Sequence, residues 1–97
     1  MALDALVSNT ARAFVDNLTP PYREEFRHVL DCLLEDPFPD RINKVELGFP
    51  YGPGTYGYAA GSFWMSYLFL NPMVLYIAAV YWSPSSPNHP IRHGASR

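Results

Sequence analysis

The sequence predicts an α+β domain in which a helical hairpin packs on an antiparallel meander sheet. Two amphipathic helical patterns come first, and alternation with a period of two begins near residue 43. An apolar stretch at residues 63–82 is then interrupted at its midpoint by Asn71-Pro72. Consecutive strands joined by tight turns pair antiparallel, and such a sheet needs a helical layer on only one face. The predicted order is strand, helix, helix and four strands, with the second sheet face open to a ligand.

The first third of the chain is predicted to hold a short edge strand and two helices. Weak alternation at residues 3–7 indicates the strand. Ser8 or Asn9 caps a helix whose apolar residues follow the spacing i, i+3, i+4, i+7. Thr19 caps a second amphipathic helix, with Pro20 at its first position, where the missing N–H costs nothing. The prolines of the EDPFPD segment end that helix, so the two helices form a hairpin.

The remaining elements are predicted to be strands. A half-buried strand at 44–47 leads into a loop rich in glycine and proline at 48–54. Gly61-Ser62 is predicted to form a tight turn between two further strands. The predicted strands after that loop cover residues 55–60, 63–70 and 73–82.

The stretch at 63–82 has a second interpretation, a single membrane-spanning helix. It is long enough to cross a bilayer, and Trp64 and Trp82 stand where interfacial aromatic residues would lie. However, a proline inside a helix costs about 3 kcal/mol, whereas Asn-Pro is ordinary turn chemistry. The abundant Val, Ile, Tyr, Phe and Trp also favour strands. We therefore expect two strands and no membrane segment.

Length and composition indicate one cytoplasmic domain. The chain has 97 residues, a formal net charge of −2 and a single cysteine, Cys32, which has no partner for an internal disulfide. The N-terminus lacks the charged start of a secretory signal. We expect residues 1–82 to form the domain and residues 83–97, rich in proline and serine, to form a flexible tail. The negative charge gives no global attraction to nucleic acid.

Several segments together resemble the RelE/ParE superfamily of type II toxin–antitoxin toxins. These segments are ARAFVDNL, FRHVLDCLLEDP, KVEL, TYGYAAGSFWMSYLFL and VLYIAAVY, and the match spans about residues 1–82. In the family a hairpin of the form Tyr-Arg-x-Arg-x-Gly-x-Tyr-Arg precedes a hydrophobic strand. The hairpin glycine matches Gly61, and the flanking aromatic residues match Tyr56 and Phe63. The resemblance implies a cytoplasmic toxin that is held by a cognate antitoxin.

The departures from the family pattern concern its charges. The three hairpin arginines would fall at Gly57, Ala59 and Trp64, and none of these residues is basic. RelE-like ribonucleases use basic clusters to bind mRNA on the ribosome and to stabilise the reacting phosphate. The loss of one such donor can lower the rate by ~10²–10³-fold. An mRNA endonuclease and a noncatalytic or ParE-like member that binds a protein target therefore remain two open alternatives.

The sequence offers few candidates for chemistry. Lys44 and Arg41 are the cations nearest the predicted sheet and are the candidate catalytic residues, although paired surface charges are the more common role of such residues. Five aromatic residues are candidates for stacking on RNA or for binding a partner. These are Tyr56, Tyr58, Trp64, Tyr81 and Trp82. His28, His89 and His93 are more typical of solvated positions, and no pattern implies a metal or another cofactor.

Overall fold

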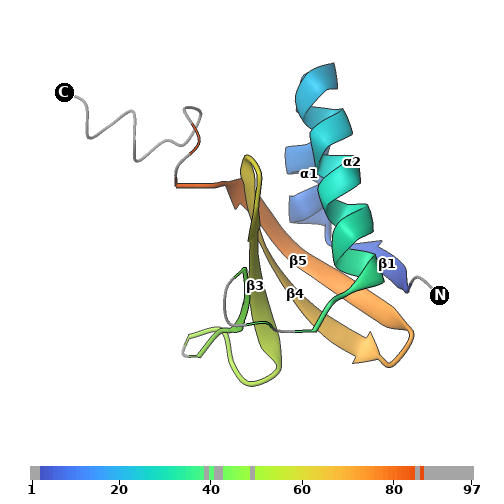
Figure 1. The fold of residues 1–97 in the computed structure, drawn as a ribbon, viewed down its shortest axis with the longest axis vertical. Coiled ribbons are helices and arrows are strands. Elements are labelled where there is room, and N and C mark those ends of the chain that lie inside the picture. Colours follow the sequence, from blue (N-terminus) through green and yellow to red (C-terminus); the bar gives the residue numbers. More distant parts are fainter. Residues whose placement is uncertain (1–2, 39, 41–42, 49, 85, 87–97) are drawn as a thin grey trace.

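The chain folds into two helices and a five-stranded sheet over the residues that its computed structural model describes, which are 3–38, 40, 43–48, 50–84 and 86 (Figure 1). The helices are α1 (Asn9–Asp16) and α2 (Pro20–Glu35). The strands are β1 (Asp4–Val7), β2 (Lys44–Glu46), β3 (Thr55–Ala60), β4 (Phe63–Asn71) and β5 (Val74–Trp82). The predicted α+β class and order of elements are confirmed.

The sheet has the strand order β1-β5-β4-β3-β2. Strands β2 to β5 form the predicted antiparallel meander. The first strand, β1, lies on the far side of β5 and pairs with it in parallel, so the complete sheet is mixed. A parallel neighbour requires a long crossover connection, and here the rest of the chain, helices included, lies between the two strands.

The apolar stretch reverses direction at the predicted point. β4 ends at Asn71 and β5 begins at Val74, and the two strands pair along most of their length. The side-chain oxygen of Asn71 accepts a hydrogen bond of 2.8 Å from the backbone N–H of Met73, which closes the turn. None of the helices in the described ranges is both long and apolar enough to cross a membrane.

Helix α1 begins at a serine that makes two side-chain hydrogen bonds. The Ser8 hydroxyl accepts from the backbone N–H of Ala11 at 3.1 Å, as an N-cap does. It also donates to the carbonyl oxygen of Ala78 in β5 at 2.7 Å. Thr19 is the N-cap of α2 as predicted, but its side chain makes no capping bond, and Pro20 follows it at the first helical position.

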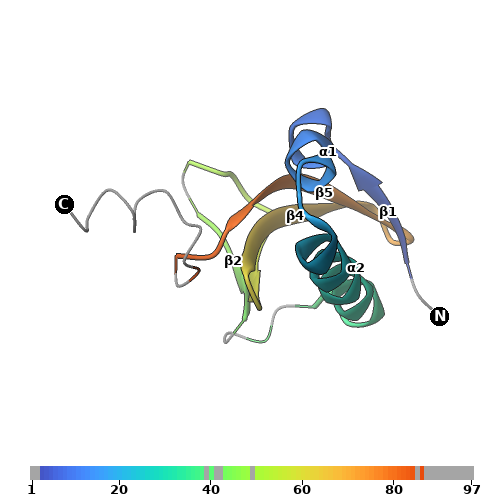
Figure 2. The same ribbon diagram turned by 90° about the horizontal axis from the view of Figure 1, so that it is seen from above.

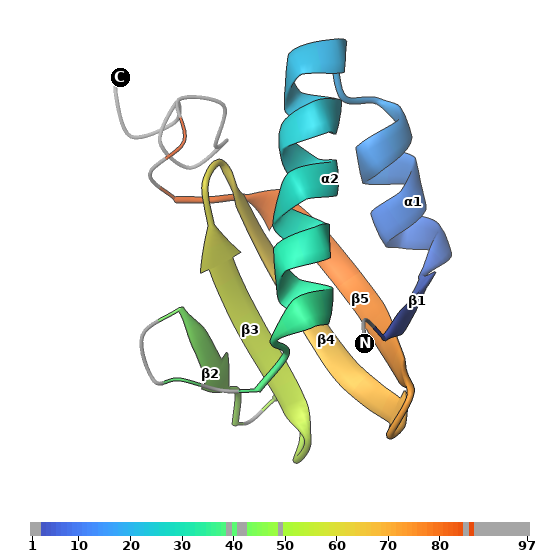
Figure 3. The ribbon, with the colours of Figure 1, turned by 45° about the vertical axis from the view of Figure 1, so that its right-hand side comes forward.

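Both helices lie side by side on one face of the sheet (Figure 3), and the sheet curves around α2 (Figure 2). Phe63 is fully buried between the layers. Its ring packs edge-on against Phe14 of α1 and Phe26 of α2, with centroid distances of 6.4 and 5.6 Å. The largest fully buried side chains are Tyr67, Phe63, Leu33, Met65, Leu75 and Ile77.

A bulge in β5 keeps its apolar residues on the helical side. Ser66 is paired with Ala79, but the next residue, Tyr67, is paired with Ile77, so Ala78 has no partner in the register. One extra residue reverses the alternation of side chains along a strand. Val80 and Ile77 therefore both face the core, although their spacing of three would otherwise place them on opposite faces.

Candidate functional site

The sheet face opposite the helices carries a cluster of three neighbouring aromatic rings, which we call the aromatic cluster: Tyr51, Trp64 and Tyr81. Trp64 follows the buried Phe63 and therefore points to the open face, since neighbouring strand residues alternate. Trp64 is the register partner of Tyr81, and their rings stack at 6.0 Å with an interplanar angle of 27°. Tyr51 comes from the loop before β3, and its ring centroid lies 6.5 Å from that of Trp64.

The aromatic cluster lines a shallow cleft of about 270 Å³ at one end of the sheet. Trp82 and Pro84 complete its lining. Tyr51 and Tyr81 are each 52% exposed, so their rings remain available to a partner. Exposed aromatic rings in a cleft are the features of protein hot spots and of base-stacking platforms.

The Trp64 ring lies directly over Gly57. A Cβ atom on Gly57 would come within 2.9 Å of Cζ2 of Trp64 and 3.1 Å of Cδ2 of Leu47. A side chain at position 57 would therefore have to displace the ring. The two departures from the family pattern at these positions fit together, because the small residue provides the space that the large one fills.

All three positions that match the hairpin arginines lie on this open face. Ala59 is the register partner of Trp64, and Gly57 lies under its ring. None of the residues that line the cleft is charged. The surface that is basic in the family pattern is therefore apolar and aromatic here.

Lys44, a candidate catalytic residue, points to the helical side of β2 and is 8% exposed. Its Nζ donates to the carbonyl oxygen of Asp36 at 2.6 Å and lies 3.5 Å from Oδ2 of that residue. Oδ2 of Asp40 is 4.0 Å away, and the Tyr58 ring centroid is 5.9 Å away. Through these contacts Lys44 connects β2 to the segment that follows α2. A catalytic role for it stays a prediction, as does that of Arg41, which lies outside the described residues.

The structure separates the five candidate aromatic residues into two groups. Trp64 and Tyr81 belong to the aromatic cluster, and Trp82 borders its cleft while packing its ring on Phe63. Tyr56 and Tyr58 face the helices instead, and Tyr58 is 8% exposed. Burial, with smaller contributions from the charges of Cys32 and Asp40, raises the pKa of Tyr58 above its usual 10.0.

Tyr51 is the member of the aromatic cluster that the sequence pattern did not predict as a candidate site residue. It lies in a loop, where no strand alternation predicts the direction of a side chain. His28 is exposed on α2, with Nε2 at 3.8 Å from Sγ of Cys32, and His89 and His93 lie outside the described residues. Among the residues that the structure covers, no group of His, Cys, Asp and Glu has an arrangement suited to a metal ion.

The fold is that of the RelE toxins. The chain is similar to the RelBE2 toxin–antitoxin complex from Mycobacterium tuberculosis, with a TM-score of 0.70, 18% identity, and coverage of 86% of this chain and 100% of the other. The intact Escherichia coli RelBE complex matches with a TM-score of 0.66 and 20% identity, and the match covers 84% of this chain and 98% of the other. The isolated Escherichia coli RelE toxin matches with a TM-score of 0.66 and 18% identity, and the match covers 98% of this chain and 96% of the other.

By sequence alone, neither a family model nor a curated protein matches this chain. The resemblance that the sequence motifs predicted is nevertheless confirmed as a shared fold. Gly61, matched to the hairpin glycine of the family, does lie in the β3–β4 turn, with a positive φ of 57° that favours glycine.

Proposed function

We propose that this protein is the toxin of a type II toxin–antitoxin pair, that it resides in the cytoplasm, and that a protein antitoxin holds it inactive. The observation that carries this proposal is the RelE toxin fold, which extends over most of the chain. Two of the three similar solved structures described above are toxin–antitoxin complexes, and this supports a protein antitoxin as the partner.

We further propose that the toxin acts by binding a protein target through the aromatic cluster. RNA binding depends mainly on cations that contact phosphates, and none lines this cleft. Tyrosine and tryptophan are enriched at protein interfaces and in hot spots. An apolar aromatic cleft therefore suits a polypeptide better than a polyanion.

Controlled expression tests both statements. We expect the protein alone to stop growth and co-expression with the neighbouring reading frame to restore it. Tyr81→Ala and Tyr51→Ala should reduce toxicity while leaving the fold intact, since both rings are half exposed. Arg12→Ala, at an exposed position of α1, is the control. Undiminished toxicity of both ring variants would exclude the cluster as the target-binding site.

A second candidate function is ribosome-dependent mRNA cleavage, and the exposed stacked rings are the observation that favours it. Base stacking on an aromatic ring contributes ~1–3 kcal/mol per base and needs no charge. In this version the cations are Lys44 and Arg41, and because Lys44 lies on the helical side of β2, its contact with RNA is separate from the stacking rings. Mapping of mRNA 5′ ends after incubation with translating ribosomes should show codon-linked cuts, and the Lys44→Ala and Arg41→Ala pair should abolish them.

A substitution at Ala59 distinguishes the two candidate functions, which are protein binding and mRNA cleavage. Ala59 is exposed beside Trp64 at a position where the family pattern has arginine. Ala59→Arg should add about one phosphate contact and steepen the salt dependence of RNA binding by ~0.7 per logarithmic unit. If the natural protein already cuts mRNA without this charge, the protein-binding version is wrong.

A further inference from the structure

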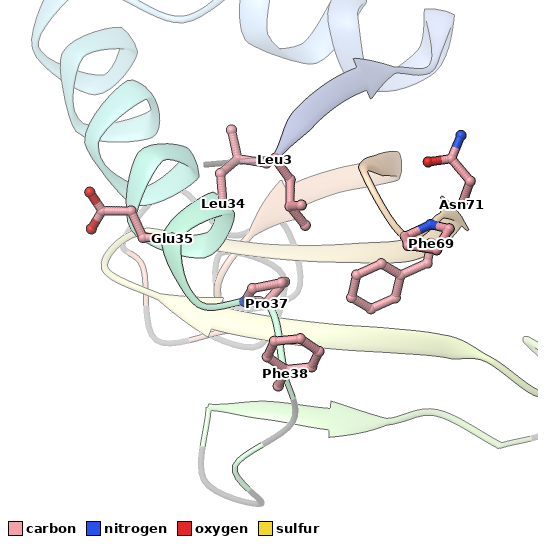
Figure 4. Close-up of a pocket in the computed structure, with 8 residues that line it drawn as sticks. Leu3, Leu34, Glu35, Pro37, Phe38, Phe69 and Asn71 are labelled. Carbon is pink, nitrogen blue, oxygen red and sulfur yellow. The ribbon is translucent and has the colours of Figure 1, made fainter. Parts of the chain in front are cut away.

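A second surface, separate from the aromatic cluster, is an apolar groove beside the C-terminal end of α2 (Figure 4). Its volume is about 500 Å³, within the usual range for binding pockets. The groove lies between the end of α2, the start of β1 and the β4–β5 turn. Its lining residues are Leu3, Leu34, Glu35, Pro37, Phe38, Phe69, Asn71 and Pro72.

Phe38 forms one wall of the groove and is 66% exposed. Its ring stacks on Phe69 at 6.0 Å with an interplanar angle of 27°. The two rings lie close together in Figure 4, with the Leu3 side chain directed toward the same space. The neighbouring Leu70 and Met73 are 51% and 54% exposed, so the apolar surface continues around the turn. A large exposed aromatic ring at the edge of a groove is a typical anchor for a partner.

The rim of the groove beside α2 is acidic. Asp31 and Glu35 are exposed and lie one turn apart on α2, and Asp36 follows directly. The last turn of α2 contains no basic residue. Lys44 contacts Asp36 at the helix C-terminus, so Asp31 and Glu35 are the carboxylates that give this rim its negative charge. Over the whole described part, nine carboxylate residues accompany four lysine and arginine residues. The groove therefore favours a cation at its rim and an apolar group inside.

We propose that this groove holds a segment of the antitoxin in which an apolar anchor residue is flanked by lysine or arginine. The anchor packs on Phe38 and Phe69, and the flanking cations lie against Asp31 and Glu35. This assignment rests on the proposed toxin function and adds the place and the chemistry of antitoxin recognition. The acidic rim disfavours a nucleic acid, and the apolar interior requires an apolar anchor residue in addition to the flanking cations.

The test uses the full chain and, as probe, the purified product of the neighbouring reading frame. Affinity is measured by isothermal titration calorimetry at two salt concentrations. Phe38→Ala should weaken binding at least tenfold, as loss of a hot-spot ring does. Glu35→Lys should weaken binding two- to tenfold at low salt and less at high salt. The controls are Leu6→Ala, at an apolar residue of β1 that is 54% exposed, and Glu24→Lys, on the same helix as Glu35, and both should leave binding unchanged.

The outcomes separate the two proposals. If the neighbouring product binds the natural protein and Phe38→Ala equally well, the groove assignment is wrong and the toxin proposal stands. If no neighbouring product exists or none binds the natural protein, the toxin proposal fails and the groove assignment fails with it. If the protein alone dimerises and Phe38→Ala abolishes the dimer, the groove is a self-association surface and the assignment to an antitoxin is overturned.

Discussion

The carboxylate of Glu25 on α2 accepts two hydrogen bonds from Ser62 in the β3–β4 turn. One comes from the backbone N–H at 2.8 Å and the other from the hydroxyl at 3.0 Å. A Cβ atom at Gly61 would collide with the same carboxylate, so the turn and the helix approach closely there. This pair fixes the hairpin that carries Ala59 and Trp64 relative to the helical layer.

Loss of the Glu25–Ser62 contact should therefore destabilise the fold. A typical intramolecular hydrogen bond contributes ~0.5–1.5 kcal/mol net to stability. We expect Glu25→Ala to lower the free energy of unfolding by about 2 kcal/mol and Ser62→Ala, which removes only the hydroxyl, by about 1 kcal/mol. Urea denaturation measures both values. Glu24→Ala is the neighbouring control, and an equal loss for Glu24 and Glu25 would contradict a specific role of the contact.

Tyr67 should give the protein an alkaline sensitivity. Its hydroxyl is buried and donates to the carbonyl oxygen of Pro37 at 2.6 Å. Burial is the main cause that raises the pKa of Tyr67 well above its usual 10.0. Because the folded state keeps the proton that the unfolded state releases, this stabilisation is complete below about pH 10. It decreases by up to ~1.4 kcal/mol per pH unit above that value.

Tyr67→Phe tests this linkage. Near pH 8 it should lower the free energy of unfolding by about 1–3 kcal/mol, because the Pro37 carbonyl loses its buried donor. Between pH 10 and 11 the difference from the natural protein should shrink, since the phenylalanine does not titrate. A difference that stays constant across this range would exclude the raised pKa of Tyr67 as the cause.

Lys44 should contribute to stability through its contacts beneath β2. Lys44→Ala removes the donor to the Asp36 carbonyl and an ammonium group close to two carboxylates. We expect a loss of about 2 kcal/mol, measured by chemical denaturation. Arg12→Ala, on the exposed side of α1, should change stability by less than ~0.5 kcal/mol. If Lys44→Ala leaves stability intact but abolishes mRNA cleavage, the catalytic prediction for Lys44 holds instead.

Gly57 and Trp64 should behave as a coupled pair. Gly57→Ala forces the Trp64 ring away and should destabilise the protein by about 1–3 kcal/mol. In a Trp64→Ala background, Gly57→Ala should destabilise the protein clearly less, and a double-mutant cycle measures the difference between the two losses of stability. Gly48→Ala is the matched control, because a Cβ atom there has no neighbour within 4 Å. Equal costs in both backgrounds would show that the ring does not restrict position 57.

The local sequence determined the elements and their turns. Ser8 and Pro20 start the helices as predicted, Gly61-Ser62 and Asn71-Pro72 reverse the chain, and each stretch between these points has a periodicity of its own. Turn and capping chemistry acts over a few residues, so it can be read directly from the sequence.

Only the tertiary structure decided which side chains face a partner. The alternation in β3 places Tyr56 and Tyr58 on one face, but the helices determine that this face is the buried one. The bulge at Ala78 changes the alternation within β5, and a carbonyl of the segment after α2 draws Lys44 inward. The aromatic cluster joins a loop to two neighbouring strands, and the groove joins the end of α2 to Leu3 and the β4–β5 turn. Such contacts depend on long-range packing, which no local pattern encodes, and for that reason both candidate surfaces emerge only in the folded chain.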